Sequence, residues 1–238
     1  MSKWKSYSSL AILLLFGVFF ILKSFQFTIN DFANYYFGGY FFTHDLFNEN
    51  IYYPEFFNKT VASLGYPNQF MSFAPNTSFL ALIFIPFSLL PLAISKLIFS
   101  VFSLSLLVVS LARLTRYFNL DKAYILLLPI VFFIPIRNNI LFGQVYFLLF
   151  FFLSEGFLAY HKTKYFKMAV WWSLAILLKI FPVILLGFLI VKKKFKAVLI
   201  LILVLGVFFA INVSITGFQI CKFYFTEVLS RASNGEIA

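Results

Sequence analysis

Long runs of apolar residues without a charged side chain recur along this chain and constrain its fold more than any other feature. The clearest runs cover residues 10–22, 145–153 and 198–211. Hydrophobic residues make up 62% of the sequence and charged residues only 11%. A water-soluble core cannot bury so much apolar surface, whereas a lipid bilayer can. The sequence therefore predicts an all-α fold, a polytopic bundle of transmembrane helices.

The basic residues lie beside these apolar runs. The net charge is +11, but most Lys and Arg form short clusters that flank apolar segments, where positive-inside topology signals are found. We therefore expect membrane lipid and not nucleic acid as the surroundings, in a cell membrane that we interpret as bacterial and cytoplasmic. The single cysteine, Cys221, excludes an intrachain disulfide. No metal-ligand spacing, Walker loop or dinucleotide fingerprint is found in the sequence.

The first apolar segment, 10–27, is long enough to span a bilayer. Lys3 and Lys5 precede it and predict a cytoplasmic N-terminus. Because no small-residue cleavage pattern follows, we interpret it as a retained helix and not as a signal peptide. The segment 28–78 is then predicted to be a large extracytoplasmic loop, with an acidic excess. Half of the acidic residues of the chain lie in this loop, namely Asp31, Asp45, Glu49 and Glu55.

The segment 79–216 is predicted to form a helical bundle and 217–238 an extracytoplasmic tail, which gives about six to seven membrane segments in all. The pattern of 79–112 fits two arrangements: two full spans, or a surface helix followed by one span. The basic loop 113–122 is expected in the cytoplasm. Because only an odd number of crossings leads there from outside, the second arrangement is favoured.

The segment 168–191 lies between two basic clusters, 161–167 and 192–196, that are both predicted to be cytoplasmic. A short hairpin satisfies both, with limbs of about 11 residues that each reach ~16 Å and a bend at 179–182. Backbone breaks at that depth are tolerated when they are buried in protein or line a wet cavity. A single tilted span with a buried Lys179 is the alternative.

Polar residues at the ends of the predicted spans gather on the extracytoplasmic side. Asp31 follows the first span, where an ionisable group is a functional candidate. A carboxylate can act as general base on an acceptor hydroxyl, and Arg or Lys can bind a phosphate leaving group. This combination suits sugar transfer from a lipid phosphate, with Asp31 as the catalytic residue. The predicted substrate-binding residues are Tyr35, Tyr36, Arg137, Asn138, Gly143, Gln144 and Lys179.

Each of these residues also has a structural interpretation. Asp31 can cap a surface helix, Arg137 can be an interfacial anchor, and Lys179 can extend its ammonium to the interface or pair structurally. The tyrosines fit an aromatic belt at the membrane interface as well as a sugar platform. Two other functions stay open: a transporter or flippase subunit for a lipid-linked or anionic substrate, and a non-catalytic membrane assembly protein.

Several short motifs occur in a characteristic order over about 28–196. They are Asp31-Phe32, Tyr35-Tyr36, Tyr52-Tyr53-Pro54, Ser72-Phe73-Ala74-Pro75, Ile85-Pro86, Leu90-Pro91, Gly143-Gln144 and Leu178-Lys179-Ile180-Phe181-Pro182. Together they resemble glycosyltransferase family 87, the polyprenyl-phosphate-mannose-dependent mannosyltransferases of the GT-C class. The chain departs from the family in having Ala74-Pro75 where a doubled proline is usual. It resembles only the N-terminal half of the longer members.

The resemblance implies a GT-C-like bundle and an inverting transfer that needs no metal and no cofactor. It also implies that the donor is a polyprenyl-phosphate sugar, that the acceptor is a glycan or lipid, and that Asp31 is the base. Because members are longer, a second chain that supplies further spans is a further expectation.

Overall fold

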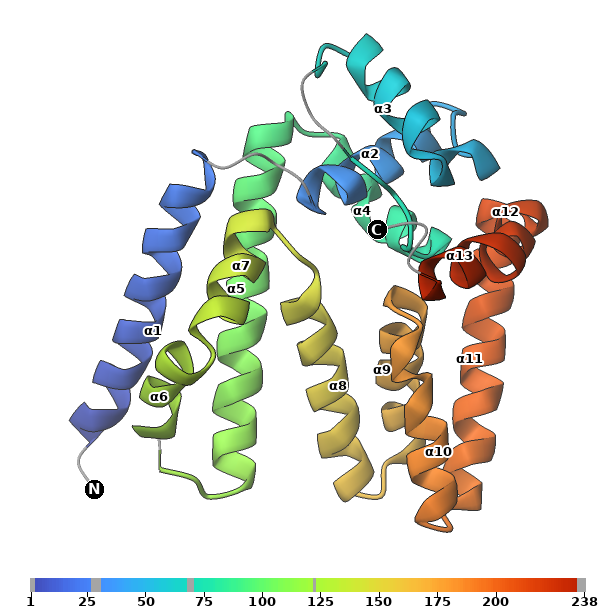
Figure 1. Cartoon of the computed structure of the whole chain (residues 1–238). Helices are drawn as coiled ribbons and strands as arrows, with labels where there is room; N and C mark the ends of the chain where they lie inside the picture. Colours follow the sequence, from blue (N-terminus) through green and yellow to red (C-terminus); the bar gives the residue numbers. More distant parts are fainter. Residues whose placement is uncertain (1–2, 27–30, 68–70, 122, 235–238) are drawn as a thin grey trace.

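The computed structural model describes residues 3–26, 31–67, 71–121 and 123–234 (Figure 1). Within these residues the chain is helical and contains no β-strand, which confirms the all-α prediction. Residues 28–30 of the predicted loop and 235–238 of the predicted tail lie outside the described part.

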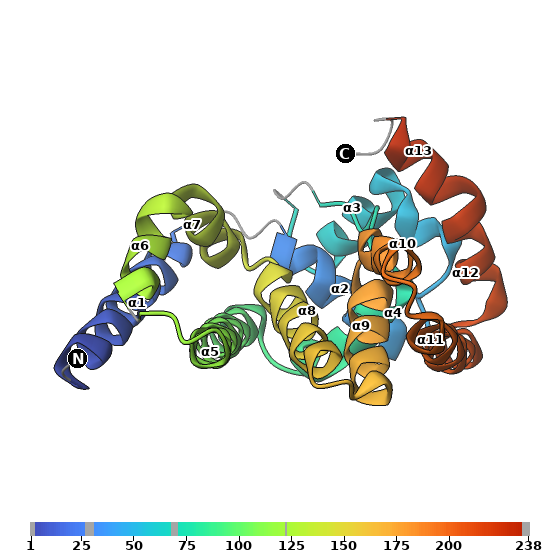
Figure 2. The ribbon, with the colours of Figure 1, turned by 90° about the horizontal axis from the view of Figure 1, so that it is seen from below.

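The helices form a layer of upright or tilted elements and a cap layer above it (Figure 1). The upright layer consists of α1 (Lys3–Ser24), α5 (Leu92–Tyr117), α6 (Ala123–Val131), α7 (Phe133–Phe142), α8 (Tyr146–His161), α9 (Tyr165–Leu178), α10 (Ile184–Val191) and α11 (Phe195–Thr216). The cap layer consists of α2 (Asp31–Thr43), η1 (Glu49–Tyr52), α3 (Pro54–Ser63), α4 (Ser78–Ser88), α12 (Phe218–Phe223), the π-helix η3 (Tyr224–Val228) and α13 (Leu229–Ser233). Figure 2 shows the upright layer from below, with α1, α6 and α7 at one end and α11 at the other.

In the part of the chain that the structure describes, three helices are long and apolar enough to cross a membrane: Tyr7–Ser24, Leu92–Tyr117 and Phe195–Thr216. A fourth candidate is the pair α7 and α8, which is bent by 118°. On α11, four large apolar side chains spaced four residues apart are between 52% and 60% exposed, namely Leu199, Leu203, Val207 and Ile211. Such a stripe is stable against lipid and not against water. The chain is therefore a membrane protein, whereas six to seven spans stay a prediction.

The segment 79–112 contains one helix that is long enough to span, α5, and the short α4 before it lies in the cap layer (Figure 1). Pro91 stands at the N-cap of α5, which separates the two helices because proline cannot continue a helix from the preceding turn. The rings of Phe32, Phe84 and Phe99 lie 5.0–5.9 Å apart and join α2, α4 and α5. This aromatic cluster fixes the cap layer on the upright layer.

Residues 31–67 and 71–78, which belong to the predicted loop 28–78, are largely helical because their aromatic side chains bury one another. Phe41, Phe57 and Phe73 are fully buried, and ring pairs link α2 to α3 and α3 to the segment before α4. The side-chain amide of Asn58 forms two hydrogen bonds with the backbone of Met71. It accepts from the N–H and donates to the carbonyl, each with a donor–acceptor distance of 2.7 Å. The segment before α4 is thereby held against α3.

The segment 168–191 breaks at the predicted bend. Helix α9 ends at Leu178, the chain turns through η2 (Phe181–Val183), and α10 begins at Ile184. The connections from α8 to α9 and from α10 to α11 lie at the same, lower end in Figure 1. The turn that carries Lys179 therefore points toward the cap layer.

Candidate functional site

Asp31 is the first residue of α2 and is half-buried. The Gln144 side-chain amide donates a hydrogen bond of 2.6 Å from Nε2 to Asp31 Oδ2. A carboxylate in the first turn of a helix is also stabilised by the helix dipole. The structure thus joins two of the predicted site residues, and the contact leaves Asp31 Oδ1 for other partners.

The turn between α7 and α8 brings Gln144 to Asp31. Gly143 caps α7 in the left-handed conformation with φ +67°, which favours glycine. A Cβ on Gly143 would lie 2.7 Å from Cβ of Phe32, the neighbour of Asp31. Asn139 supports the turn: in the orientation that satisfies its amide, it donates to the Gln144 carbonyl at 3.2 Å and accepts from the Tyr146 N–H at 3.3 Å. Gly143 therefore acts by allowing close approach of the two segments.

Lys179 approaches the same site from the turn after α9. Its Nζ donates to Oδ1 of the buried Asn76 at 2.7 Å and lies 6.0 Å from the centre of the Tyr146 ring. Its ammonium also interacts electrostatically with the Asp31 carboxylate. Thr77 holds the two segments together through a 2.5 Å hydrogen bond to the Leu177 carbonyl. A carboxylate, an amide and a cation from distant parts of the sequence thus share one site.

The two predicted tyrosines are buried beneath this site. Burial raises the pKa of Tyr35 well above its usual range, and the nearby charge of Asp31 raises it further. The phenol therefore stays protonated at any physiological pH, next to the carboxylate. Tyr36 is 7% exposed, and its hydroxyl donates to the Leu90 carbonyl at 2.9 Å, which ties α2 to the turn before α5. The substrate-binding role of both tyrosines stays a prediction.

Arg137 and Asn138 lie earlier on α7. Arg137 is half-buried, six residues and ~9 Å along the helix axis before Gly143. Among the residues that the structure describes, no hydrogen bond or ion pair links Arg137 to Asp31 or to Lys179. Asn138 lines a groove with Gln144 and Tyr146. The Lys179 ammonium thus lies within electrostatic range of Asp31, whereas no such link is found for Arg137 among the described residues.

Two apolar cavities flank the site. One, of about 360 Å³, lies between α9 and α11 and reaches Thr77 and Ile180 on either side of the Lys179–Asn76 contact. The other, of about 520 Å³, lies between α5, α6, α7 and α8. We call the second cavity the α7–α8 groove. The site therefore has an apolar space on each side, one beside the cation and one beside Gln144.

Lys96 is a fully buried cation on α5 that the apolar pattern of 79–112 does not single out. Its Nζ donates to the Ser24 carbonyl at 3.0 Å and to the Leu141 carbonyl at 2.9 Å. These carbonyls belong to the last turns of α1 and α7, where helix dipoles favour a positive charge. Lys96 therefore holds together the two helix ends that lead to Asp31 and to Gln144.

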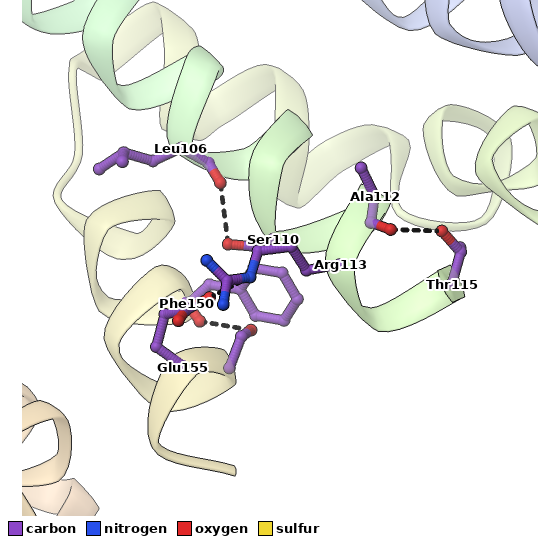
Figure 3. Close-up of polar contacts among 8 residues, drawn as sticks. Leu106, Ser110, Ala112, Arg113, Thr115, Phe150 and Glu155 are labelled. Atoms are coloured by element: carbon purple, nitrogen blue, oxygen red, sulfur yellow. Dashed lines mark hydrogen bonds and ion pairs between the residues drawn. The ribbon is translucent and has the colours of Figure 1, made fainter. Parts of the chain in front are cut away.

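Glu155, a further charged group within the apolar layer, pairs with Arg113 and not with a residue of this site. Arg113 Nε on α5 approaches Oε1 of the buried Glu155 on α8 at 2.9 Å (Figure 3). Arg113 lies in the last part of α5, toward the end of the upright layer opposite the cap.

No group of three or more His, Cys, Asp or Glu side chains that could hold a metal ion is found in the described part of the chain. The site chemistry available from the described residues is that of a carboxylate, amides, a phenol and an ammonium.

Comparison with known proteins gives one family. Glycosyltransferase family 87 matches residues 76–237. No curated protein and no solved structure matches the chain. The matched part includes Asn76, Gln144 and Lys179, whereas Asp31 precedes it. Since the match covers more than half of the sequence and the helices have the length and apolarity of a membrane protein, the chain belongs to glycosyltransferase family 87.

Proposed function

We propose that this chain is a GT-C-class membrane glycosyltransferase that moves a hexose, mannose by the family resemblance, from a polyprenyl phosphate to an extracytoplasmic acceptor. The observation that supports it best is the meeting of Asp31, Gln144 and Lys179 at one site. Family membership supplies the reaction class, and this site supplies the groups that such a reaction needs.

In the proposed reaction the Asp31 carboxylate accepts the proton of an acceptor hydroxyl. The hydroxyl oxygen forms a bond to the anomeric carbon, and the bond from that carbon to the phosphate oxygen breaks. The lipid phosphate leaves with the electron pair, and the Lys179 ammonium stabilises its charge. Gln144 orients the carboxylate by binding Oδ2, so that Oδ1 faces the acceptor.

The proposed orientation places the cap layer outside the cytoplasm. The beginning of α1, the end of α5 and the connections of α8 to α9 and α10 to α11 lie together at the lower end in Figure 1. Most of the basic residues belong to these regions, and basic residues favour the cytoplasmic side. A cytoplasmic N-terminus, six to seven membrane segments, a bacterial cell membrane and a partner chain that supplies further spans belong to this proposal.

The ion pair of Arg113 with Glu155 argues against the transporter alternative. A transport path needs polar groups along its length, and Glu155 is occupied by Arg113. Glu155 and Lys96, two of the charged residues within the apolar layer, are thus engaged with protein groups.

Replacement of the proposed base tests this function. General-base catalysis contributes roughly 10²–10⁴-fold, so Asp31→Asn is expected to lower kcat at least about 100-fold and to change donor affinity little. The assay measures transfer from radiolabelled polyprenyl-phosphate mannose to envelope lipids and glycans, by the purified full chain in nanodiscs.

Asp45→Asn is the matched control. Asp45 lies in the same segment, is exposed and has φ +57°, which asparagine tolerates, so transfer is expected to be unchanged. A purified Asp31→Asn variant that transfers sugar as fast as the wild type would remove Asp31 from the reaction.

A further inference from the structure

A third cavity, of about 560 Å³, lies between α1, α5 and α6 and is separate from the candidate site. Of its lining residues only Leu111 also lines the α7–α8 groove. Its polar lining consists of Tyr7, Thr115, Arg116 and Asn119, and its other lining residues are apolar. We call this cavity the α1–α5 groove. Its volume lies within the range of roughly 300–1,000 Å³ typical of small-molecule sites.

The polar residues of the α1–α5 groove lie at one end of it. On α5 the apolar Val108 precedes Arg116 by eight residues, which is ~12 Å along the helix axis, and Asn119 follows the end of this helix. On α1, Tyr7 precedes the apolar Leu13. The beginning of α1 and the end of α5 both lie at the lower end in Figure 1. The groove is therefore polar at its lower end and apolar toward the middle of the two helices.

Arg116 is the cation of this polar end, and the carbonyls of its own helix do not occupy it. The N–H groups of Asn119 and Leu120 donate to carbonyls of the last turn of α5, at 3.4 and 2.9 Å, and Asn119 has the left-handed conformation with φ +52°. Arg113, one turn earlier, pairs with α8. Among the described residues no ion pair and no side-chain hydrogen bond is found for Arg116. Asp121, the next acid in the sequence, is not among the residues that line the groove.

The apolar part of the groove is formed by helices that belong to the bilayer. Both α1 and α5 are candidate membrane spans, and Leu15 on α1 and Val109 on α5 are 69% and 42% exposed. A water-soluble anion would have to lose its hydration to enter this part. A lipid acyl chain already resides in such surroundings.

An anionic phospholipid has the same division as the groove. Its phosphate oxygens are acceptors for the parallel N–H groups of an arginine, and tyrosine rings are enriched at the level of the head groups. Basic pockets between membrane helices bind anionic head groups in the same way.

We propose that the α1–α5 groove binds an anionic glycerophospholipid, with its phosphate at Arg116 and Asn119 and an acyl chain along Val108 and Ala112. This inference goes beyond the proposed function, because it concerns a site that shares no catalytic residue with it. Lipid binding can therefore be measured whether or not the chain transfers sugar.

Photolabelling of the purified full chain in phosphatidylcholine nanodiscs tests the proposal. Two probes with the same diazirine at the end of an acyl chain are compared, phosphatidylglycerol and phosphatidylcholine. Since a basic residue beside an anionic lipid favours binding by about fivefold, the phosphatidylglycerol probe should label peptides 7–13 and 108–120 about fivefold more. On the rest of the chain the two probes should label equally.

Arg116→Gln should abolish this preference. Lys192→Gln is the matched control: Lys192 is exposed, caps α10 and lies near the same lower end, but it does not line the groove, so the preference should persist. Ala112→Trp fills the groove from an exposed position and should also abolish the preference, although Arg116 is intact. Val109→Trp, the same change on the neighbouring residue outside the lining, should retain it.

Thermal unfolding in pure phosphatidylcholine shows whether each variant is folded, and if Arg116→Gln is not, the two tryptophan variants decide. Equal labelling by the two probes in the wild type overturns the proposal, because the groove then holds bilayer lipid without regard to charge. A preference that Ala112→Trp retains, or that Lys192→Gln loses, also overturns it. Excess glycerol 3-phosphate, which has no acyl chain, should leave the labelling unchanged. If it removes the preference, the groove is a site for a free phosphate and not for a lipid.

Discussion

A methyl group added at Gly143 should separate Gln144 from Asp31 in the candidate site. Gly143 has φ +67°, and an added Cβ would lie 2.7 Å from Cβ and 3.3 Å from Cγ of Phe32. Cβ of Phe32 is fixed by the backbone of α2 and cannot rotate away. Gly143→Ala must therefore move the turn between α7 and α8 away from the beginning of α2, where Asp31 lies.

The size of the effect follows from these distances. An L-residue in the left-handed region costs about 1–2 kcal/mol, and overpacking of a tight contact costs about 1–3 kcal/mol. The free energy of unfolding should thus fall by about 2–5 kcal/mol. Non-bonded carbons prefer about 3.5–4.0 Å, so the segments must separate by about 1 Å. The 2.6 Å hydrogen bond from Gln144 to Asp31 would then lengthen to about 3.6 Å, which is no longer a hydrogen bond.

The assay pairs Gly143→Ala with Gly65→Ala. Gly65 has φ +96°, and no atom lies within 4 Å of its added Cβ, so this control carries backbone strain without a clash. Both variants are compared with the wild type in nanodiscs for thermal unfolding and for sugar transfer. Gly143→Ala should lower the Tm more than the control and reduce kcat about tenfold or more, whereas Gly65→Ala should retain transfer.

Two results would refute this reasoning. If Gly143→Ala and Gly65→Ala lose the same stability, the contact with Phe32 has no energetic weight. If Gly143→Ala loses stability but transfers sugar at the wild-type rate, the hydrogen bond between Gln144 and Asp31 does not organise catalysis.

Three further changes separate functional from structural roles. Lys179→Gln should raise the donor KM about 10- to 100-fold through loss of a charge-assisted contact, and Arg137→Gln should raise it less. Transfer kinetics measure both values. Equal effects would contradict the proposal that Lys179, and not Arg137, binds the donor phosphate. Arg113→Ala leaves the buried Glu155 unpaired and should lower the free energy of unfolding by about 2–3 kcal/mol, less than a fully buried pair because Arg113 is 48% exposed. Thermal unfolding checks this value. If Glu155→Gln lowers the free energy of unfolding more than Arg113→Ala does, the unpaired Glu155 carboxylate is not the cause of the loss. Tyr36→Phe removes the hydrogen bond to the cap turn and should cost about 1 kcal/mol with transfer intact; a selective loss of transfer would instead place Tyr36 at the sugar.

The long helices can be predicted from the sequence because short windows of residues are sufficient to indicate them. Charge-free runs are long enough to span a bilayer, and basic clusters mark their ends, so α1, α5 and α11 follow from the composition of short windows. The break after α9 was predictable for the same reason, since two basic clusters on one side require the chain between them to return. The helical cap over 31–78 was less accessible, because its stability comes from aromatic contacts such as that of Phe41 with Phe57, at a ring distance of 5.1 Å.

The contacts of the site depend on tertiary structure, and the sequence predicted them only in part. Asp31, Gln144 and Lys179 were candidates because each lies at the end of an apolar segment. The hydrogen bond of Gln144 to Asp31 and the position of the Lys179 ammonium within electrostatic range of Asp31 depend on the direction of each side chain from its helix. The left-handed turn at Gly143 decides this for Gln144. Gly143 was predicted as a substrate-binding residue, and the structure shows that its contact is with Phe32.

The two lysines in apolar surroundings show why a cation must be judged by its partners. Lys96 donates to two carbonyls at the negative ends of two helices, and it is fully buried. An ammonium has three donors, and the one hydrogen bond found for Lys179 among the described residues goes to Asn76. In the proposed reaction the remaining donors of Lys179 bind the leaving phosphate, and the Asp31 carboxylate lies within electrostatic range of the ammonium. Lys96 therefore stabilises the junction of two helices, whereas the half-buried Lys179 has the donors that the proposed contact with phosphate needs.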